Sequence, residues 1–564
     1  MSRLIIVLAR FLTALGVLIS GCCSSLAQQA DTILVNGKIV TLDQRSSIAD
    51  ALAIRDQRIE AVGAAADVLP RRGDRTRIID LGGRTVIPGL IDSHIHAIRA
   101  GFKFSTEVSW IGCASLSDAM ERIRSAAKNA KPGSWIVVGG GWTPNQFVEQ
   151  RRPTQAELIA AAPDHPVYVQ LFYRAVLLTP AGLHALGVRD EADLPANMTF
   201  DRGNDGLASG WLTADTAAIT ELYSRLPRPS LDESMAGTRR FLHELNRYGI
   251  TAVIDPGGHN LAPEDYEPLF RLWRAGELTV RISYSICAPR PGRELADLQI
   301  LTRFLPMGFG DGMLRFNGIG ERLTWGMYNN DTPTELQKDE LYRVARWAAE
   351  LRMTLTAHWN NERSVYHLLD VFERVDRELP IRDLRWSVAH LHDASEPSLT
   401  RMMSLGVGWL MQNGLYFAAP SFLVSRGAAI NRAPPIRTAL RLGLSIGGGT
   451  DADRVMSYNP FVSLKWMVDG RTVDGMTTRG ASELISREEA LRIYTAGSAW
   501  FAFDEDQRGT LEPGRLADLA VLDRDYLTVP IEEIGGLSAV LTMVGGRIVH
   551  ASEPLQDFGA KSDN

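Results

Sequence analysis

The sequence predicts an α/β protein: a TIM-like (β/α)8 barrel with a small β-sandwich domain that is built from both chain ends. Three observations support this prediction. The middle of the chain alternates strand-like and helix-like segments, which is typical of a parallel sheet. Both ends are rich in short strands separated by turn residues. Several middle strands run directly into histidines, as expected where strand ends build an active site.

Residues 1–27 are predicted to be a secretory signal rather than part of the fold. Arg3 and Arg10 supply positive charge ahead of and beside the apolar run 11–19, and small residues follow. The sequence ISGC, ending at Cys22, resembles a bacterial lipobox, which would leave a lipidated Cys22. The sequence SLA, ending at Ala27, resembles an ordinary cleavage site. Both alternatives stay open, and both predict an exported protein in the periplasm or lipid-anchored to the cell envelope.

Residues 30–88 and 500–555 are predicted to form one composite β-sandwich. The stretch from Thr32 to Val40 is typical of a hairpin, because two β-rich runs flank Asn36-Gly37. A second hairpin is expected at 540–549, around Gly545-Gly546. Because the ends of a domain often lie close together, we expect the barrel to be inserted between these segments. Further strands are expected at 51–54, 58–62, 84–87 and 516–522.

Residues 89–499 are predicted to form the barrel. A segment of about 100–235 is too long for one βα unit, so we interpret it as an insertion that covers the barrel mouth. Helices are expected between the strands, for example at 341–351 and 365–374. Buried strands are expected at 249–255, 314–319, 354–358, 386–390 and 444–448.

The strongest chemical signal is an apolar strand that runs into His94-Ile95-His96. Side chains two residues apart on a strand point the same way, so His94 and His96 can hold one metal ion. Imidazole nitrogen suits zinc, and also iron, nickel or copper. Asp92, just before this pair, is interpreted as a strand-end group rather than a ligand.

Three further candidates also follow strands. His358 and His390 each end an apolar run, and Asp451 follows the glycine-rich turn 447–449. A lone histidine in such a place is more often structural, and aspartate is common in turns. Four histidines on three strand ends instead favour a metal centre, in which Asp451 is a catalytic carboxylate.

The order His-x-His, His, His, Asp, with β-rich segments at both ends, resembles the amidohydrolase superfamily. Within it the chain is most similar to the amidohydrolase-3 group, which includes N-substituted formamide deformylases and D-aminoacylase-like hydrolases. Supporting phrases lie at 249–255, 488–491, 494–496 and 514–519, and the resemblance covers roughly residues 32–550. It implies a divalent metal such as zinc, one or two ions per chain. It also implies that His94, His96, His358 and His390 are ligands, that Asp451 touches the metal and acts as general base, and that His358 or His390 helps to stabilise the oxyanion.

The chain departs from this family pattern at three places. Relatives carry a lysine that can be carboxylated to bridge two metals, and the corresponding strand here has none. Glu321 lies one residue past that position and also offers a bidentate anion, so it is a candidate bridging ligand; an ion pair with Arg322 is the alternative. Arg174 and Ala214 stand where relatives have a histidine and a glutamate. The number of metal ions is therefore left open.

The predicted function is hydrolysis of a non-peptide, amide-type carbon–nitrogen bond by metal-activated water. The alternatives are a deaminase or cyclic amide or ester hydrolase on the same site, and an exported binding protein without catalysis. Arg174 is a candidate partner for a substrate carboxylate, with a structural ion pair as the alternative. Trp142 and Trp359, with Tyr173, Trp325 and Trp409, are candidate aromatic lining, with core packing as the alternative.

Composition limits the partners to small molecules. The chain has 60 Lys+Arg against 66 Asp+Glu, a net charge of −6, which gives no basic surface for nucleic acid. No stretch after the signal is apolar enough to span a bilayer, so membrane attachment is expected only through Cys22. Cys113 and Cys287 are expected to be separate buried thiols. The oligomeric state is left open.

Overall fold

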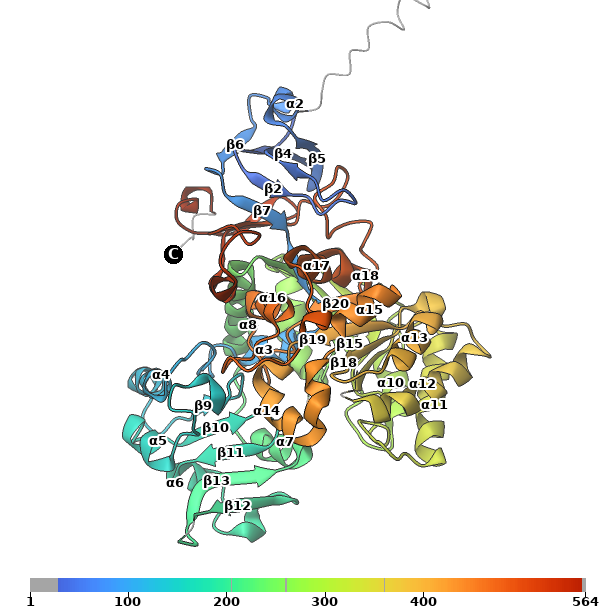
Figure 1. Ribbon diagram of the computed structural model, residues 1–564. Coiled ribbons are helices and arrows are strands. Elements are labelled where there is room, and N and C mark those ends of the chain that lie inside the picture. Colours follow the sequence, from blue (N-terminus) through green and yellow to red (C-terminus); the bar gives the residue numbers. More distant parts are fainter. Residues whose placement is uncertain (1–28, 204, 259–260, 360, 560–564) are drawn as a thin grey trace, which may run out of the picture.

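A computed structural model of the chain describes residues 29–203, 205–258, 261–359 and 361–559 (Figure 1). The predicted signal at 1–27, with Cys22, lies outside the described residues. Within them, no helix is both long and apolar enough to cross a membrane. Cys113 and Cys287 are buried and unpaired, which confirms the prediction of separate thiols.

Eight parallel strands occupy the centre of the molecule in two four-stranded sheets. The first sheet has the order β16-β15-β14-β8 and the second β17-β18-β19-β20, and neighbouring strands are parallel throughout. Their bounds are β8 Leu90–Asp92, β14 Ile250–Asp255, β15 Arg281–Ile286, β16 Leu314–Ile319, β17 Thr356–Trp359, β18 Ser387–His390, β19 Gly408–Gln412 and β20 Ile446–Gly449.

Backbone contacts join the two parallel sheets at both of their outer edges. On one side Ile319, the last residue of β16, forms a parallel bridge with Leu355, just before β17. On the other side the Ser93 N–H donates to the Gly448 carbonyl at 2.9 Å, and the Asp451 N–H donates to the His94 carbonyl at 2.8 Å. The two parallel sheets are therefore in backbone contact at both edges.

Helices pack around these strands with one apolar face inward, as α11 (Glu335–Glu350) illustrates. Thr334 caps its first turn and forms a capping box with Gln337. Its buried residues recur at the spacing of one helix face and join the main hydrophobic core. Other helices that follow strands are α3 Ala97–Lys103, α9 Glu267–Arg274, α10 Glu294–Leu301, α12 Glu362–Asp376, α13 Glu396–Leu405 and α16 Pro460–Asp469.

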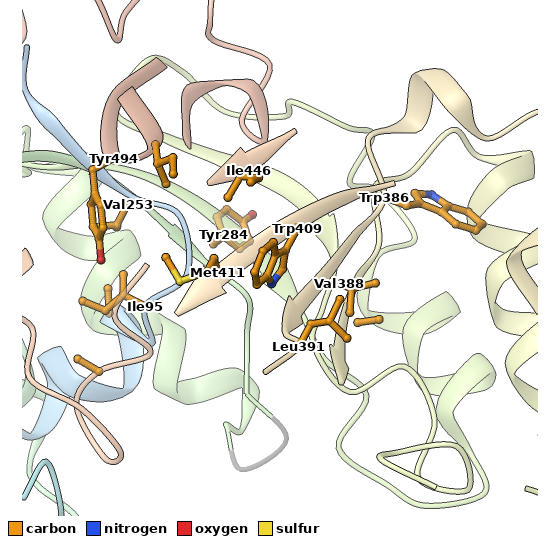
Figure 2. Close-up of a cluster of buried hydrophobic side chains, with 14 of the residues drawn as sticks. Ile95, Val253, Tyr284, Trp386, Val388, Leu391, Trp409, Met411, Ile446 and Tyr494 are labelled. Atoms are coloured by element: carbon orange, nitrogen blue, oxygen red, sulfur yellow. The ribbon is translucent and has the colours of Figure 1, made fainter. Parts of the chain in front are cut away.

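The main core fills the space between the parallel strands and the helices that cover them. Figure 2 shows part of it, with Trp409 and Met411 of β19 beside Ile446 of β20. All three belong to one buried cluster, which extends from β8 to the helices on the far side of the second sheet. This packing fixes the strand ends from which the candidate site projects.

Strands from both chain ends share one six-stranded sheet, which lies at the top of Figure 1. Its order is β23-β22-β21-β7-β2-β3, so β7 (Thr85–Pro88) pairs with β21 (Leu519–Leu522) on one side and with β2 (Lys38–Val40) on the other. A second sheet, β5-β4-β1-β6, shares an apolar cluster with it. The remaining bounds are β1 Thr32–Val35, β3 Ile48–Ala49, β4 Ala51–Arg55, β5 Arg58–Gly63, β6 Arg77–Asp80, β22 Ala539–Val544 and β23 Arg547–Ala551.

The predicted hairpin from Thr32 to Val40 is wrong. β1 pairs with β4 and β6, whereas β2 pairs with β3 and β7, so the two runs belong to different sheets. Asn36 has a φ of 56°, and the Gly37 N–H donates to the Asp50 carbonyl, so the turn redirects the chain instead of folding it back. The second predicted hairpin is confirmed, since β22 and β23 pair antiparallel around Gly545-Gly546.

The insertion forms a five-stranded sheet of its own, in the order β12-β13-β11-β10-β9. It lies at the lower left of Figure 1 with α4 (Leu116–Asn129), α5 (Gln155–Ala161) and α7 (Thr216–Ser224). Its apolar clusters are separate from the main core. The strands are β9 Ile136–Val138, β10 Val167–Leu171, β11 Ala175–Leu178, β12 Met198–Arg202 and β13 Ala208–Ala214.

A buried ion pair fastens the C-terminal strands to the parallel sheet. Arg281 opens β15, and its Nε lies 2.8 Å from Oδ2 of Asp518, the residue before β21. The two side chains are 7% and 2% exposed, and Asp518 also accepts from the Gly545 N–H. Removing one partner of such a pair leaves an uncompensated buried charge, which costs about 3–5 kcal/mol. We therefore expect Asp518→Ala to lower the free energy of unfolding by about 3–5 kcal/mol.

Denaturant unfolding, followed by circular dichroism, measures this loss. The double variant Arg281→Met/Asp518→Leu removes both charges and is expected to recover part of it. The same unfolding midpoint for Asp518→Ala and the wild type would show that the pair does not hold the two parts together.

Candidate metal centre

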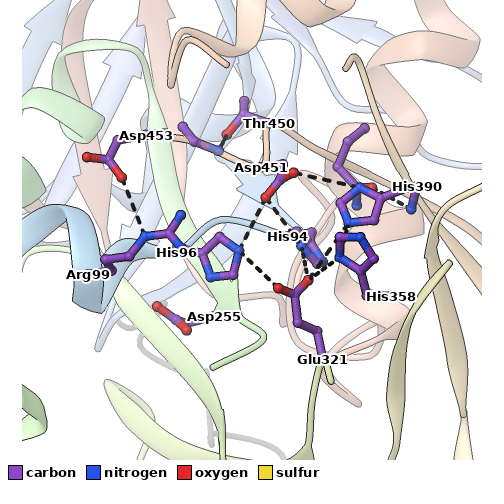
Figure 3. A network of polar contacts seen from close by, with 12 residues as sticks. His94, His96, Arg99, Asp255, Glu321, His358, His390, Thr450, Asp451 and Asp453 are labelled. Atoms are coloured by element: carbon purple, nitrogen blue, oxygen red, sulfur yellow. Dashed lines mark hydrogen bonds and ion pairs between the residues drawn. The ribbon is translucent and has the colours of Figure 1, made fainter. Parts of the chain in front are cut away.

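Six of the side chains singled out by the sequence meet at the carboxyl ends of the parallel strands (Figure 3). All six are largely buried, and the most exposed, Asp451, has 15% of its side chain exposed. They come from five strands: His94 and His96 follow β8, Glu321 follows β16, His358 lies in β17, His390 ends β18, and Asp451 follows β20.

Glu321 lies between the histidines, and its two oxygens face different ones. Oε2 is 3.3 Å from His94 Nε2 and 3.2 Å from His358 Nδ1. Oε1 is 3.5 Å from His96 Nε2. Each oxygen therefore has its own imidazole neighbours.

The alternative for Glu321, an ion pair with Arg322, is not found among the described residues. The Arg322 guanidinium instead lies against two rings, 3.9 Å from the centroid of Trp325 and 4.0 Å from that of Tyr328. Arg322 therefore packs on aromatic faces while Glu321 turns toward the histidines.

Asp451 connects the two halves of the cluster from the opposite side. Its Oδ1 is 3.2 Å from His96 Nε2 and 3.7 Å from His94 Nε2, and its Oδ2 is 3.7 Å from His390 Nδ1. The backbone of Asp451 is left-handed, with φ of 55°, a conformation that aspartate adopts more readily than most residues. Its own N–H is bound to the His94 carbonyl, so the carboxylate is fixed relative to the His-x-His pair.

Glycines let β20 approach β8 closely enough to bring Asp451 and His94 together. A Cβ on Gly449 would lie 2.7 Å from the His94 backbone nitrogen, closer than real Cβ contacts come. The sequence indicated a strand at 444–448 and a glycine-rich turn here, but not this close approach. Asp92 links the two strand ends by hydrogen bonds. Its carboxylate accepts from the Thr450 hydroxyl at 2.6 Å and from the backbone N–H groups of His94 and Thr450.

Hydrogen bonds orient the rings of the other histidines. His96 Nδ1 donates to the Gly257 carbonyl at 2.8 Å, which turns its Nε2 toward Glu321 and Asp451. A 2.8 Å hydrogen bond joins His358 Nε2 to the Tyr328 hydroxyl, and its Nδ1 faces Glu321. Sequence reasoning did not single out Tyr328, because a tyrosine seven residues past a strand-end glutamate carries no recognisable spacing.

The donor set fits a divalent metal. His94 is completely buried, and neither of its ring nitrogens has a hydrogen-bond partner among the described residues. Such unsatisfied buried groups are rare without a ligand or ion. Two overlapping groups have ligand atoms that all lie within 4.8 Å of one another: His94, His96 and Asp451, and His94, Glu321 and His390. Imidazole nitrogens with carboxylate oxygens are a donor set that zinc accepts.

The site keeps its carboxylates ionised. Burial alone would raise the pKa of Asp451, but the charge of His390 and the hydrogen bond with His96 hold it at about 2. Burial is likewise outweighed at Glu321, where the charges of His96 and His358 hold the pKa well below its usual value. Burial, followed by the charge of His390, lowers the pKa of His358 to about 4. Ionised carboxylates and a neutral imidazole are the forms that bind metal.

The side chains of the predicted substrate contacts form no hydrogen bond or ion pair with these six side chains among the described residues, although Trp359 directly follows His358 in β17. Trp142 is fully buried in the core of the insertion, where its Nε1 donates to the Gln170 carbonyl at 2.7 Å. Trp359 is 1% exposed and packs in the main core. Arg174 is exposed, and its Nη1 reaches Ser421 at 3.5 Å. Packing accounts for both rings, and in the described part of the chain no hydrogen bond or ion pair joins Arg174 to the cluster.

Sequence reasoning missed Arg99, although its position offered a signal. It lies three residues after His96, in the first turn of α3, and Figure 3 shows it beside that histidine. Its Nη1 donates to the Tyr173 hydroxyl at 3.0 Å, and its Nε is 3.8 Å from Asp453 Oδ1. A buried arginine one helical turn from a ligand pair is a candidate binding group in its own right.

Comparisons with known proteins agree with this geometry. The model of the amidohydrolase family matches residues 77–550. The chain is 27% identical to "Protein LONG AFTER FAR-RED 3" of Arabidopsis thaliana, over 92% of this chain and 91% of that protein. It is 25% identical to an N-substituted formamide deformylase of Arthrobacter pascens, over 92% and 98%. The zinc-complexed atrazine chlorohydrolase TrzN of Arthrobacter aurescens shares the fold, with a TM-score of 0.54 and 18% identity over 93% and 96% of the two chains.

Proposed function

Because the chain belongs to the amidohydrolase family and is a metal-dependent hydrolase of carbon–nitrogen bonds other than peptide bonds, we propose that it cleaves an amide-type bond with Asp451 as general base. The observation that carries the proposal is the meeting of four histidines with Glu321 and Asp451 at one ring of strand ends. Such strand ends are where barrels of this kind place catalytic groups.

The proposed ligands are His94, His96, Glu321, His358, His390 and Asp451. Their support is the burial of the cluster, the buried Nδ1 of His94, which has no hydrogen-bond partner among the described residues, and the contacts of the two Glu321 oxygens with different histidines. We propose zinc as the metal, one or two ions per chain, because the donor set combines imidazole and carboxylate. A bound divalent metal would lower the pKa of water to about 7 and so supply hydroxide at neutral pH.

The protein's own residues then handle the proton and the charge. Asp451, ionised and within reach of the centre of the cluster, accepts the proton of the attacking water and delivers it to the leaving nitrogen. His358 Nδ1 lies 2.9 Å from His390 Nε2, so the two rings face the same space. They stabilise the oxyanion that forms at the substrate carbonyl. The products are an acid and an amine.

We propose that the eight parallel strands close into one (β/α)8 barrel, spanning 89–499. The support is the bridge from Ile319 to Leu355 at one edge and the Ser93–Gly448 hydrogen bond at the other. The two terminal sheets would form the composite β-sandwich of 30–88 and 500–555, supported by the apolar cluster that they share. The insertion around 100–235 would cover the barrel mouth.

We further propose that the enzyme is exported, in the periplasm or lipid-anchored at Cys22. The support is the sequence of residues 1–27. Arginine precedes an apolar run, small residues follow it, and two possible cleavage sites come next.

The test of the proposed function combines metal content with turnover. The protein is purified without added metal, its metal is measured by elemental mass spectrometry, and amine release is followed on a panel of N-formyl and N-acyl amines. We expect activity to fall in step with metal removed by a chelator and to return when zinc is restored. Circular dichroism of the stripped protein controls for unfolding. Hydrolysis that continues unchanged after complete metal removal would contradict the proposal.

A further inference from the structure

A cavity of 420 Å³ is lined in part by Arg99, whose side chain lies beside His96 of the proposed metal centre (Figure 3). Two of its lining residues follow the centre closely in sequence: Arg99 comes three residues after His96, and Trp325 comes four residues after Glu321. The volume falls within the range of about 300–1,000 Å³ that is usual for small-molecule sites. The cavity is therefore placed to hold the part of a substrate that extends away from the reacting bond.

Most charged groups around the cavity are already paired. Arg454 is buried and makes two hydrogen bonds, of 2.9 and 3.0 Å, to the carboxylate of Glu107. On another wall Arg228 pairs with Asp265. Asp453 is 3.8 Å from Arg99 Nε, which is too long for a hydrogen bond, so this Nε has no hydrogen-bond partner among the described residues.

Lys103 lines the cavity but takes part in none of these ion pairs. Its ammonium lies 3.7 Å from the centroid of the Tyr223 ring and 5.0 Å from that of Phe102. Within the described ranges, no carboxylate comes within ion-pair distance of it. An enclosed charge without a counter-charge is unfavourable, and ring faces replace only part of its hydration. Burial, followed by the charge of Arg454, accordingly lowers the pKa of Lys103 to about 7.

Resting on the proposed hydrolysis, we propose that this cavity binds a carboxylate carried by the substrate, with Lys103 as its counter-charge. The apolar walls, among them Phe102 and Trp325, suit a short hydrocarbon link between that carboxylate and the amide. The substrate class is thus an amide with a carboxylate at its far end. Arg174, which the sequence suggested for this role, is not among the residues that line the cavity.

The test uses pairs of substrates that differ only in charge. Formamido-alkanoates of increasing chain length are compared with the matching neutral carboxamides, for the wild type and for Lys103→Met, which removes the charge but keeps the side-chain length. We expect the wild type to prefer the carboxylates. In Lys103→Met, kcat/KM for the carboxylates is expected to fall by about 10- to 100-fold, the loss typical of a hydrogen bond to a charged group. The carboxamides should be unaffected, and Lys103→Arg should restore part of the preference.

Lys131→Met is the matched control, because it removes an exposed lysine that does not line the cavity. A binding arm separates this inference from the proposed reaction: titration calorimetry of the same carboxylates with Asp451→Asn needs no turnover. Binding that depends on Lys103 supports the cavity assignment even if no amide is hydrolysed. Equal kcat/KM for both members of each pair in the wild type, or an equal loss for both in Lys103→Met, would overturn it while leaving the hydrolase function intact.

Discussion

Replacing Asp451 by asparagine is expected to lower kcat by about 10²- to 10⁴-fold, which is the usual contribution of a positioned general base. Asparagine keeps the size of the side chain and one oxygen, so it can still face His96 and His390. It cannot take up a proton from water. The backbone N–H that holds position 451 to the His94 carbonyl is unchanged by the substitution. Metal content should therefore stay close to that of the wild type while turnover is lost.

Elemental mass spectrometry and steady-state kinetics on the same preparation check both halves of this prediction. Asp469→Asn is a suitable control, because Asp469 pairs with Lys465 and takes no part in the metal cluster. If Asp451→Asn hydrolyses amides at the wild-type rate, Asp451 is not the base. If the variant loses its metal instead, the residue acts mainly as a ligand.

Replacing Glu321 by alanine is expected to remove at least one metal ion per chain and, with it, most of the activity. Glu321 contacts four histidines, with its Oε2 3.8 Å from His390 Nε2 in addition to the three shorter contacts. Alanine leaves these imidazoles facing one another without an anion between them. For a binuclear site the expected change is from about two ions to one or fewer, and kcat should fall with the lost ion.

The conservative variant Glu321→Gln separates charge from shape, since it keeps the volume but offers a weaker ligand. Glu335→Ala, which removes an exposed carboxylate at the start of α11, is the matched control. Equal metal content in Glu321→Ala and the wild type would mean that Glu321 is structural and that the histidines and Asp451 bind the metal without it.

The sequence was most informative where chemistry and strand periodicity coincide. His94 and His96 could be placed together because side chains two apart on a strand share a face. His358 and His390 could be grouped because each ends an apolar run, and Asp451 could be added because it follows the glycine-rich turn after another strand. Glu321 was identified only as a neighbour of an expected lysine position, and the sequence left its partners open. Its contact with four histidines depends on how strands distant in sequence are arranged.

Some strands escaped prediction for local reasons. β15 contains Arg281, Ser283 and Ser285, all buried, and such polar alternation is typical of a half-exposed strand. Here the arginine is neutralised by Asp518, a partner far along the chain. The hairpin predicted at Asn36-Gly37 was wrong because a turn signal does not show which strands the flanking segments will pair with.

The aromatic residues show the same limit. Trp142 and Trp359 proved to be core side chains, whereas Trp325 lines the cavity beside the site. Composition cannot distinguish these roles, because a large ring serves equally well in a core and in a binding wall. Lys103 belongs to no recognisable motif, and its proposed role rests on the lack of a carboxylate within ion-pair distance among the described residues.

The sheet shared by both termini has a consequence for how the enzyme is made. β7 leads within a few residues into β8 and the His-x-His pair, and one of its two neighbours, β21, belongs to the last part of the chain to be synthesised. Joining segments so far apart closes a very long loop, a step whose entropic cost must be met before the contact stabilises anything. A nascent chain that still lacks β21 holds β7 by β2 alone. His94 and His96, the first two of the proposed metal ligands to be synthesised, are therefore among the last to be fixed in place.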